Sequence, residues 1–149
     1  MKIKLTQQKE RDEIEVEIKY SEMNSVVNHL VKRLENANYS ICGDENGRRY
    51  KIAVDEVCYI ESVDRKTFIY STNQVFRTEK KLYQLLEELK YHDFVQISRS
   101  VIVNINVLES MKMLANSRIQ VTLQNGEKLN ASRTYIPYIK KAFSREEES

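Results

Sequence analysis

Three short basic clusters hold the side chains of this chain that are best suited to binding an anion. Arg65-Lys66 lies between two strand-like segments, Ser98-Arg99-Ser100 opens a third, and Ser132-Arg133 joins a fourth to the last helical pattern. Loops at such boundaries present side chains that a rigid scaffold holds in place. A guanidinium group can contact two acceptors on a phosphate or a guanine, and serine hydroxyls bind phosphate oxygens. If the fold brings these boundaries to one edge, they form a hydroxyl-plus-arginine surface.

Composition alone favours a solvated or salt-bridged role for each of these arginines.

The sequence contains no clear catalytic motif. The three glycines are too scattered for a phosphate-cradling loop. Ser98 and Ser132 have arginine neighbours but no adjacent histidine or lysine base. The acidic pairs Asp55-Glu56 and Glu61 with Asp64 are more typical of turns between strands than of acid-base catalysis. We therefore predict that the chain is not an enzyme and has no small-molecule substrate.

The cysteines and histidines predict neither a metal site nor a cofactor. Cys42 and Cys58 are the only cysteines, His29 and His92 are the only histidines, and no pair has ligand spacing. We expect two free, mostly buried thiols and histidines in structural or solvated positions.

Length and composition fit one folded domain with a small extension. With 149 residues, 41% of them hydrophobic and a single proline, the chain can build one core and does not read as disordered. The uncharged runs are about half as long as a bilayer-spanning helix, and the first residues lack a signal-peptide pattern. These features predict a cytoplasmic protein.

The positive charge is concentrated in the second part of the chain. Basic and acidic residues balance in residues 1–40, whereas residues 41–144 hold sixteen basic against twelve acidic residues. This excess is modest, so any interaction with nucleic acid must depend on where individual arginines and lysines lie.

The hydrophobic pattern predicts a mainly β chain with flanking helices, an α+β class. Alternation indicates strands, and apolar residues at helical spacing indicate helices. Asn46-Gly47 and Asn125-Gly126 predict hairpin turns, and Pro137 is compatible only with the first turn of a helix. The expected strands are 2–8, 13–20, 39–43, 48–54, 57–63, 67–71, 74–78, 94–98, 100–111, 118–123 and 128–132, and the expected helices are 26–34, 80–89 and 132–143.

Four motifs in register resemble the LytTR-type DNA-binding domain of bacterial transcriptional regulators. They are FVQISRSVIVN at residues 94–104, the helix before it, YKIAVDEVCYIES at 50–62 and LNASRTYIPYIKKAF at 129–143. The resemblance implies a sheet-based domain over residues 48–144, whose loops enter successive major grooves of a bent duplex. It also implies a transcription factor that binds double-stranded promoter DNA, as a homodimer on repeated half-sites.

The resemblance carries the family's contact regions onto eight positions. Asn104 matches the family's V-N, and we expect it to be structural, with its amide satisfying backbone groups beside the contact loop. Relatives often have a basic residue at the position of Gln96 and a histidine at that of Ser98. The expected DNA-binding residues are Arg65, Lys66, Gln96, Ser98, Arg99, Ser100, Ser132 and Arg133.

The resemblance leaves residues 1–47 and 145–149 outside the domain. The first segment is too short for the phospho-receiver found in many relatives. We expect it to be a strand-strand-helix extension that serves dimerisation or binds a partner, or that covers one edge of the main sheet. Similar short regulators are often controlled by a membrane-bound inhibitor. Residues 145–149 form an acidic tail.

Two other functional classes remain open from the sequence. A protein-protein interaction module would also explain the modest net charge. An RNA-binding domain would use Tyr59, Phe68, Tyr70 or Phe76 as stacking platforms on a sheet face, although alternating aromatic residues are more often part of a core.

Overall fold

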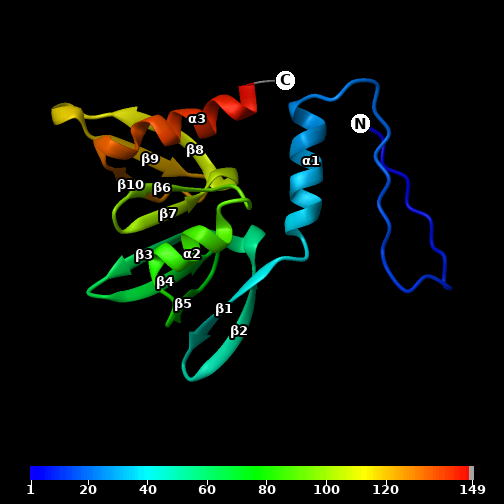
Figure 1. Cartoon of the computed structure of the whole chain (residues 1–149), viewed down its shortest axis with the longest axis horizontal. Coiled ribbons are helices and arrows are strands. Elements are labelled where there is room, and N and C mark those ends of the chain that lie inside the picture. The colour runs from blue at the N-terminus through cyan, green and yellow to red at the C-terminus, as the bar shows by residue number, and fades with distance from the viewer. Residues whose placement is uncertain (148–149) are drawn as a thin grey trace.

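The computed structural model describes residues 1–147 as two antiparallel sheets with helices packed against them (Figure 1). The first sheet has seven strands in the order β2-β1-β5-β4-β3-β7-β6, and the second has three in the order β10-β9-β8. The strands are β1 Ser40–Glu45, β2 Arg48–Ala53, β3 Val57–Val63, β4 Lys66–Ser71, β5 Val75–Thr78, β6 Phe94–Ser98, β7 Val101–Asn104, β8 Leu108–Met113, β9 Ile119–Leu123 and β10 Lys128–Ala131.

The first two helices begin and end within two residues of the predicted 26–34 and 80–89, but the last lies four residues further along the chain than the predicted 132–143. They are α1 Ser25–Asn36, α2 Leu82–Leu89 and α3 Ile136–Glu147, with a short 3-10 turn at Arg133–Tyr135. The Asn24 side chain accepts the Val27 N–H at 3.0 Å and caps α1. Pro137 is the second residue of α3, where its missing N–H leaves no intrahelical bond unmade. The mainly β fold with flanking helices is therefore confirmed.

The core consists of two clusters on opposite faces of the large sheet. Ile60 of β3 packs on one face with Leu85 and Leu89 of α2. Its neighbour Tyr59 points to the other face, into a cluster that includes Val121 of β9 and Ile139 of α3. Successive residues of a strand face opposite sides, so β3 belongs to both clusters. Burial on both faces makes the middle of this sheet rigid enough to hold loops at its edge.

The alternation predicted a single strand at residues 100–111, and this prediction is wrong. The segment divides into β7 and β8, which belong to different sheets, with a 3-10 turn at Ile105–Val107 between them. Asn104 makes the break, since its Oδ1 accepts the Asn106 N–H at 3.0 Å and its Nδ2 donates to the Val57 carbonyl at 2.9 Å. The apolar run continues through the break because residues on both sides of it, such as Val103 and Leu108, pack in or against a core cluster.

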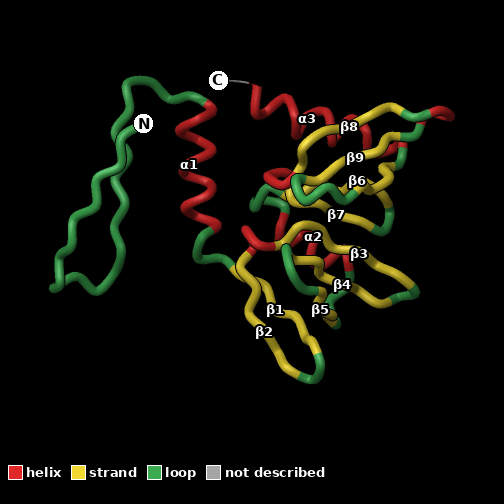
Figure 2. The backbone as a smooth tube through the Cα atoms, turned by 180° about the vertical axis from the view of Figure 1, so that it is seen from behind, coloured by secondary structure: helices red, strands yellow, loops and turns green. Residues whose placement is uncertain are grey.

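Residues 1–24, which we call the arm, contain no hydrogen-bonded strand, so the two strands predicted at 2–8 and 13–20 are wrong. Figure 2 shows the arm as loop throughout, on the far side of α1 from the sheets. β1 lies within the predicted extension 1–47 but pairs with β2 and β5 inside the large sheet. The acidic tail predicted at 145–149 begins within the backbone of α3, and residues 148–149 lie outside the described residues.

The two cysteines are free, but only one of them is buried. Cys58 faces the second core cluster, and burial is the main cause that raises the pKa of its thiol. Cys42 is exposed, contrary to the expectation of mostly buried thiols, because its β1 neighbours Ile41 and Gly43 take the inward positions. No helix of the described residues has the length and apolar character needed to cross a bilayer.

Candidate nucleic-acid interface

Two of the three basic clusters lie side by side at one edge of the large sheet. β3 runs into the turn that contains Arg65, and β7 starts at Val101, two residues after Arg99. β3 pairs antiparallel with both β4 and β7, so the β3–β4 and β6–β7 turns emerge at the same edge. The Ser62 N–H near the end of β3 donates to the Ser100 carbonyl of the β6–β7 turn at 2.8 Å and holds the two turns next to each other.

The third cluster reaches the same edge from the small sheet. Ser132 follows the last residue of β10, and its N–H donates to the Ile97 carbonyl of β6 at 2.8 Å. In Figure 1 the β3–β4 turn, the β6–β7 turn and the start of the last helix all lie at the left of the molecule. We call residues 64–66, 98–100 and 132–133 together the basic edge.

The β6–β7 turn presents Arg99 between two serines. The Ser98 Oγ accepts the Ser100 N–H at 3.3 Å, and the two hydroxyl oxygens lie 3.5 Å apart. Such a bond from a serine to the backbone two residues on stabilises a turn. Both serines are half-buried and Arg99 is exposed. The local sequence therefore fixes the backbone while leaving the guanidinium group open to a ligand.

The β3–β4 turn holds two non-glycine residues in the left-handed region. Asp64 has φ of 51° and Arg65 has φ of 66°. Two successive positive φ values suit the twist of a two-residue hairpin, for which Asn-Gly is the usual choice. The β1–β2 turn of the same sheet has that choice, with Asn46 at 50° and Gly47 at 78°. Arg65 therefore holds a conformation that costs about 1 to 2 kcal/mol for an L-residue, and such strain points to a functional role.

A reciprocal exchange tests this interpretation. Arg65→Gly should stabilise the fold by about 0.5 to 1 kcal/mol, because the backbone strain that it relieves exceeds the extra conformational entropy that glycine loses on folding. The same substitution should weaken binding to duplex DNA. Gly47→Arg, its matched control, places an arginine where a Cβ would have no neighbour within 4 Å. It should destabilise the fold and leave DNA binding unchanged. Urea unfolding and fluorescence anisotropy measure the two effects, and a loss of stability in Arg65→Gly would contradict the strain argument.

The arginines of the basic edge lack carboxylate partners. Among the residues that the structure describes, neither Arg65, Arg99 nor Arg133 makes an ion pair, and all three are exposed. By contrast, Arg49 on β2 lies 3.3 Å from Asp44. An exposed arginine that no carboxylate neutralises can still bind an external anion. This difference favours a binding role over the salt-bridged role that composition alone suggested.

Gln96 differs from the other residues predicted to bind DNA, and Asn104 is the neighbouring residue expected to be structural. Gln96 pairs with Ile102 inside the sheet and is half-buried, so it is set back from the turn where Ser98 pairs with Val101. Asn104 is buried, and the oxygen and nitrogen of its side-chain amide each form a hydrogen bond with the backbone, which confirms the structural role expected for it. However, Asn104 ends β7 and does not adjoin the β6–β7 turn, so its hydrogen bonds lie away from the basic edge.

Two further cations lie at the same edge and were missed from the sequence. The Lys81 Nζ lies 3.5 Å from the carbonyl oxygen of Arg65, because β5 pairs with β4 and ends beside the turn. Arg118 directly precedes β9, whose first residue pairs with Ala131 at the end of β10. Both side chains are exposed. Strand register alone reveals their position, and the sequence gives no signal of it apart from their charge.

Three of the four aromatic residues proposed as RNA-stacking platforms, Tyr59, Tyr70 and Phe76, pack in or against the core clusters. Tyr59 and Phe76 are buried, and the Tyr59 ring stacks on Tyr70 with centroids 4.3 Å apart. The Tyr59 hydroxyl donates to Glu127 at 2.6 Å, and burial followed by this bond raises the pKa of Tyr59 strongly. Tyr59 packs in the cluster that the large sheet shares with β9 and Tyr70 packs against it, whereas Phe76 packs in the cluster on the opposite face. None of these three rings forms an open stacking surface.

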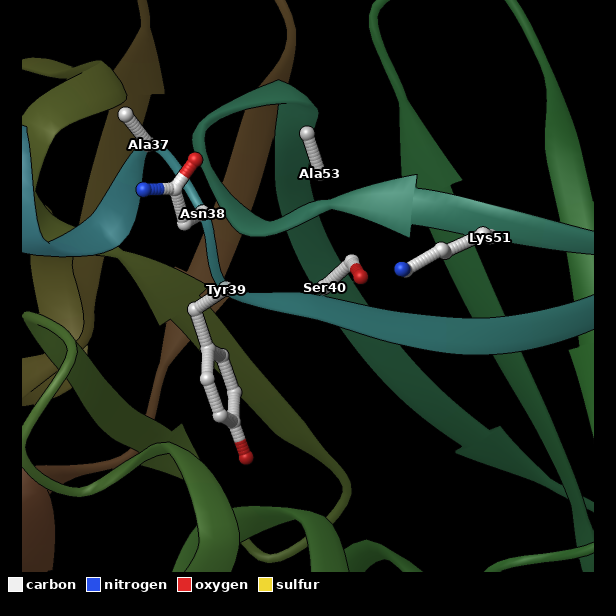
Figure 3. Close-up of a pocket in the computed structure, with 6 residues that line it drawn as sticks. All are labelled: Ala37, Asn38, Tyr39, Ser40, Lys51 and Ala53. Carbon is white, nitrogen blue, oxygen red and sulfur yellow. The ribbon is translucent and has the colours of Figure 1, made fainter. Parts of the chain in front are cut away.

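A shallow hollow of about 280 Å³ lies elsewhere, at the junction of α1 and the β1–β2 hairpin. Figure 3 shows its lining, in which Lys51 supplies the charged group and Tyr39 points away toward α2. The Tyr39 hydroxyl is engaged by Glu88 at 3.0 Å. The hollow has no convergent set of polar groups that would recognise a ligand. Within the described residues, histidine, cysteine and acidic side chains do not gather into a metal-binding group.

Comparison with known proteins identifies a family and a shared fold. The model of the LytTr DNA-binding domain family matches residues 47–144. Proteins of Staphylococcus aureus strains MSSA476 and MW2, each named an uncharacterized HTH-type transcriptional regulator, are 25% identical over 146 residues, which cover 97% of this chain and 99% of theirs. A solved LytTr DNA-binding domain from Bacillus cereus aligns with a TM-score of 0.65 and 22% identity, and the match covers 70% of this chain and 95% of that one. This last likeness shows a shared fold.

Proposed function

We propose a function from one established fact: this chain belongs to the LytTr DNA-binding domain family, whose model matches residues 47–144. In our proposal the chain is a transcriptional regulator that reads promoter DNA through the basic edge, with Arg99 and Arg133 in contact with bases. The convergence of three separate loops at one sheet edge is the observation that carries it. The similar staphylococcal proteins are named transcriptional regulators, which supports the regulatory part.

The geometry of the basic edge suits readout by loops. Turns project from a sheet that is covered on both faces, so they keep their spacing when the protein meets a duplex. The guanidinium groups can form paired hydrogen bonds with guanine, whereas Ser98, Ser100 and Ser132 are suited to phosphate oxygens. The names of the staphylococcal relatives refer to a helix-turn-helix, but the candidate surface here consists of strand turns.

Lys81 and Arg118 extend the proposed surface on either side of the basic edge. Both are exposed, and neither has a carboxylate partner among the ion pairs of the described residues. We assign them to phosphate contacts, because phosphate binding needs positive charge more than a particular geometry.

Anisotropy binding across a salt series tests the proposal. The labelled duplexes are the DNA upstream of the protein's own gene and a scrambled control. We expect tight binding to the first alone, with a log-log salt slope of about −3 to −5 if four or five cations contact phosphates. Lys81→Ala and Arg118→Ala should each make the slope shallower by about 1 for every duplex. Lys51→Ala on β2 is the matched control and should change neither quantity.

The outcomes separate the alternatives. Equal and weak binding to both duplexes would contradict sequence-specific recognition, and no binding even at low salt would favour a protein-protein interaction module. A further comparison uses unlabelled competitors. If single-stranded DNA displaces the labelled duplex as efficiently as duplex DNA does, the protein is not specific for double-stranded DNA.

The assembly on DNA follows from the same proposal. We expect two molecules to occupy half-sites about 10 to 10.5 base pairs apart, or a multiple of that spacing, so that both lie on one side of the duplex. Binding to chromosomal DNA would make the protein cytoplasmic, and a role in recognition alone requires no enzymatic step. Control by a membrane-bound inhibitor stays a prediction from the family.

A further inference from the structure

The arm exposes apolar side chains that a folded chain normally buries. Ile3 is 74% exposed, Leu5 92% and Ile14 93%, although each sits in an alternating apolar and charged pattern typical of a half-buried strand. In Figures 1 and 2 the arm runs beyond α1, away from both sheets. The body of the same chain therefore does not cover the apolar side of the arm.

The two segments of the arm carry charges of opposite sign. Lys2 and Lys4 alternate with apolar residues in the first segment, and Glu13 and Glu17 do so in the second. Between them the chain turns at residues 8–11, where the Arg11 N–H donates to the Gln8 carbonyl at 3.2 Å. An extended segment places alternate side chains on opposite faces, so each segment has one apolar and one charged face.

The adjoining helix continues the apolar surface. Val27 of α1 is buried against the body, but Val26 is 58% exposed and Leu34 41% exposed. A stable protein interface takes about 20 to 30 residues from each partner, which the arm and the open side of α1 together supply. Two-stranded hairpins are at best marginally stable alone, whereas three or more strands with an apolar face are stable.

We propose that the arm is a self-association element, whose partner is the arm and α1 of a second copy of this chain. A two-fold symmetric interface requires a self-complementary surface, and the opposite charges of the two segments provide one. The basic segment of one copy lies beside the acidic segment of the other, and the reverse contact forms at the same time. The four segments then cover each other's apolar faces. This inference goes beyond the proposed DNA binding and does not depend on it.

A charge-exchange experiment tests the pairing on the full chain in the absence of DNA. Light scattering coupled to size exclusion should give wild type a mass of twice 17.6 kDa. Lys2→Glu/Lys4→Glu makes both segments acidic, and Glu13→Lys/Glu17→Lys makes both largely basic. We expect each variant alone to dissociate at least ten-fold more readily than wild type. An equimolar mixture should restore a dimer that contains one copy of each.

The mixture separates association between copies from pairing within one arm. A hairpin held together only within each chain would not regain partners on mixing, so monomers in the mixture would overturn the proposal. A wild type that stays monomeric at about 100 μM would overturn it too, since the arm would then fold on its own α1 or bind a different protein. Lys51→Glu, an exposed charge reversal on β2, is the matched control and should remain dimeric.

Binding to a duplex that contains one half-site distinguishes a failure of self-association from a failure of DNA recognition. The charge variants lie outside the basic edge, so we expect them to bind a single half-site like wild type, and to lose only the gain from two linked half-sites. Weak binding of wild type itself to every duplex would contradict the proposed function while leaving the association result intact. Loss of single half-site binding in the charge variants would contradict the separation of arm and basic edge.

Discussion

Arg99→Ala and Arg133→Ala will each weaken binding to the specific duplex by about 1 to 3 kcal/mol, if the two guanidinium groups contact bases. Every 1.4 kcal/mol corresponds to a ten-fold change in Kd, so each loss is measurable by anisotropy. The double variant should retain mainly the binding it shows toward scrambled DNA, because the specific advantage of DNA-binding proteins is about 4 to 10 kcal/mol.

Stability should change little in these variants. Arg99 and Arg133 are exposed and make no ion pair within the described part of the chain, and substitutions of that kind usually stay within about 0.5 kcal/mol of wild type. Arg49→Ala is the matched control, since Arg49 is an exposed arginine on β2 at the opposite end of the large sheet from β6. Its removal should leave DNA affinity intact. Normal binding by both test variants, with folding unchanged, would show that the site is elsewhere.

Leu85→Ala will lower the free energy of unfolding by about 2 to 5 kcal/mol, because it removes a side chain from a packed core and leaves a cavity. Leu85 is 1% exposed and packs in the cluster between α2 and the large sheet. Urea unfolding followed by circular dichroism measures this loss. The expected effect is a large part of the total stability of a domain of this size.

Tyr83→Ala on the same helix is the control for Leu85→Ala. Tyr83 is 72% exposed, so its removal should change the free energy of unfolding by less than about 0.5 kcal/mol. Equal losses in the two variants would mean that the leucine face of α2 is not the buried one. The comparison thus tests the leucine pattern as core packing and not as a partner-binding surface.

The local sequence pattern was sufficient to predict most of the helices, strands and turns. Both Asn-Gly turns, the leucine helix α2 and the strands of the large sheet were predictable, because turn chemistry and side-chain periodicity act over a few residues. The same reasoning failed for the arm, where the alternating pattern is present but the described structure contains no strand. It also failed at Asn104, whose side-chain hydrogen bonds to Val57 and Asn106 end one strand and start the turn to another.

The sequence specified the basic residues and the loops that carry them, since arginine, serine and turn-forming residues can be read directly from the chain. Their assembly into one surface depended on pairing between distant strands: β3 with β7, and Ser132 with Ile97. The same long-range register added Lys81 and Arg118 to that edge and set Gln96 back from it. Strand register is fixed by the packing of whole faces against each other, so no local pattern contains it.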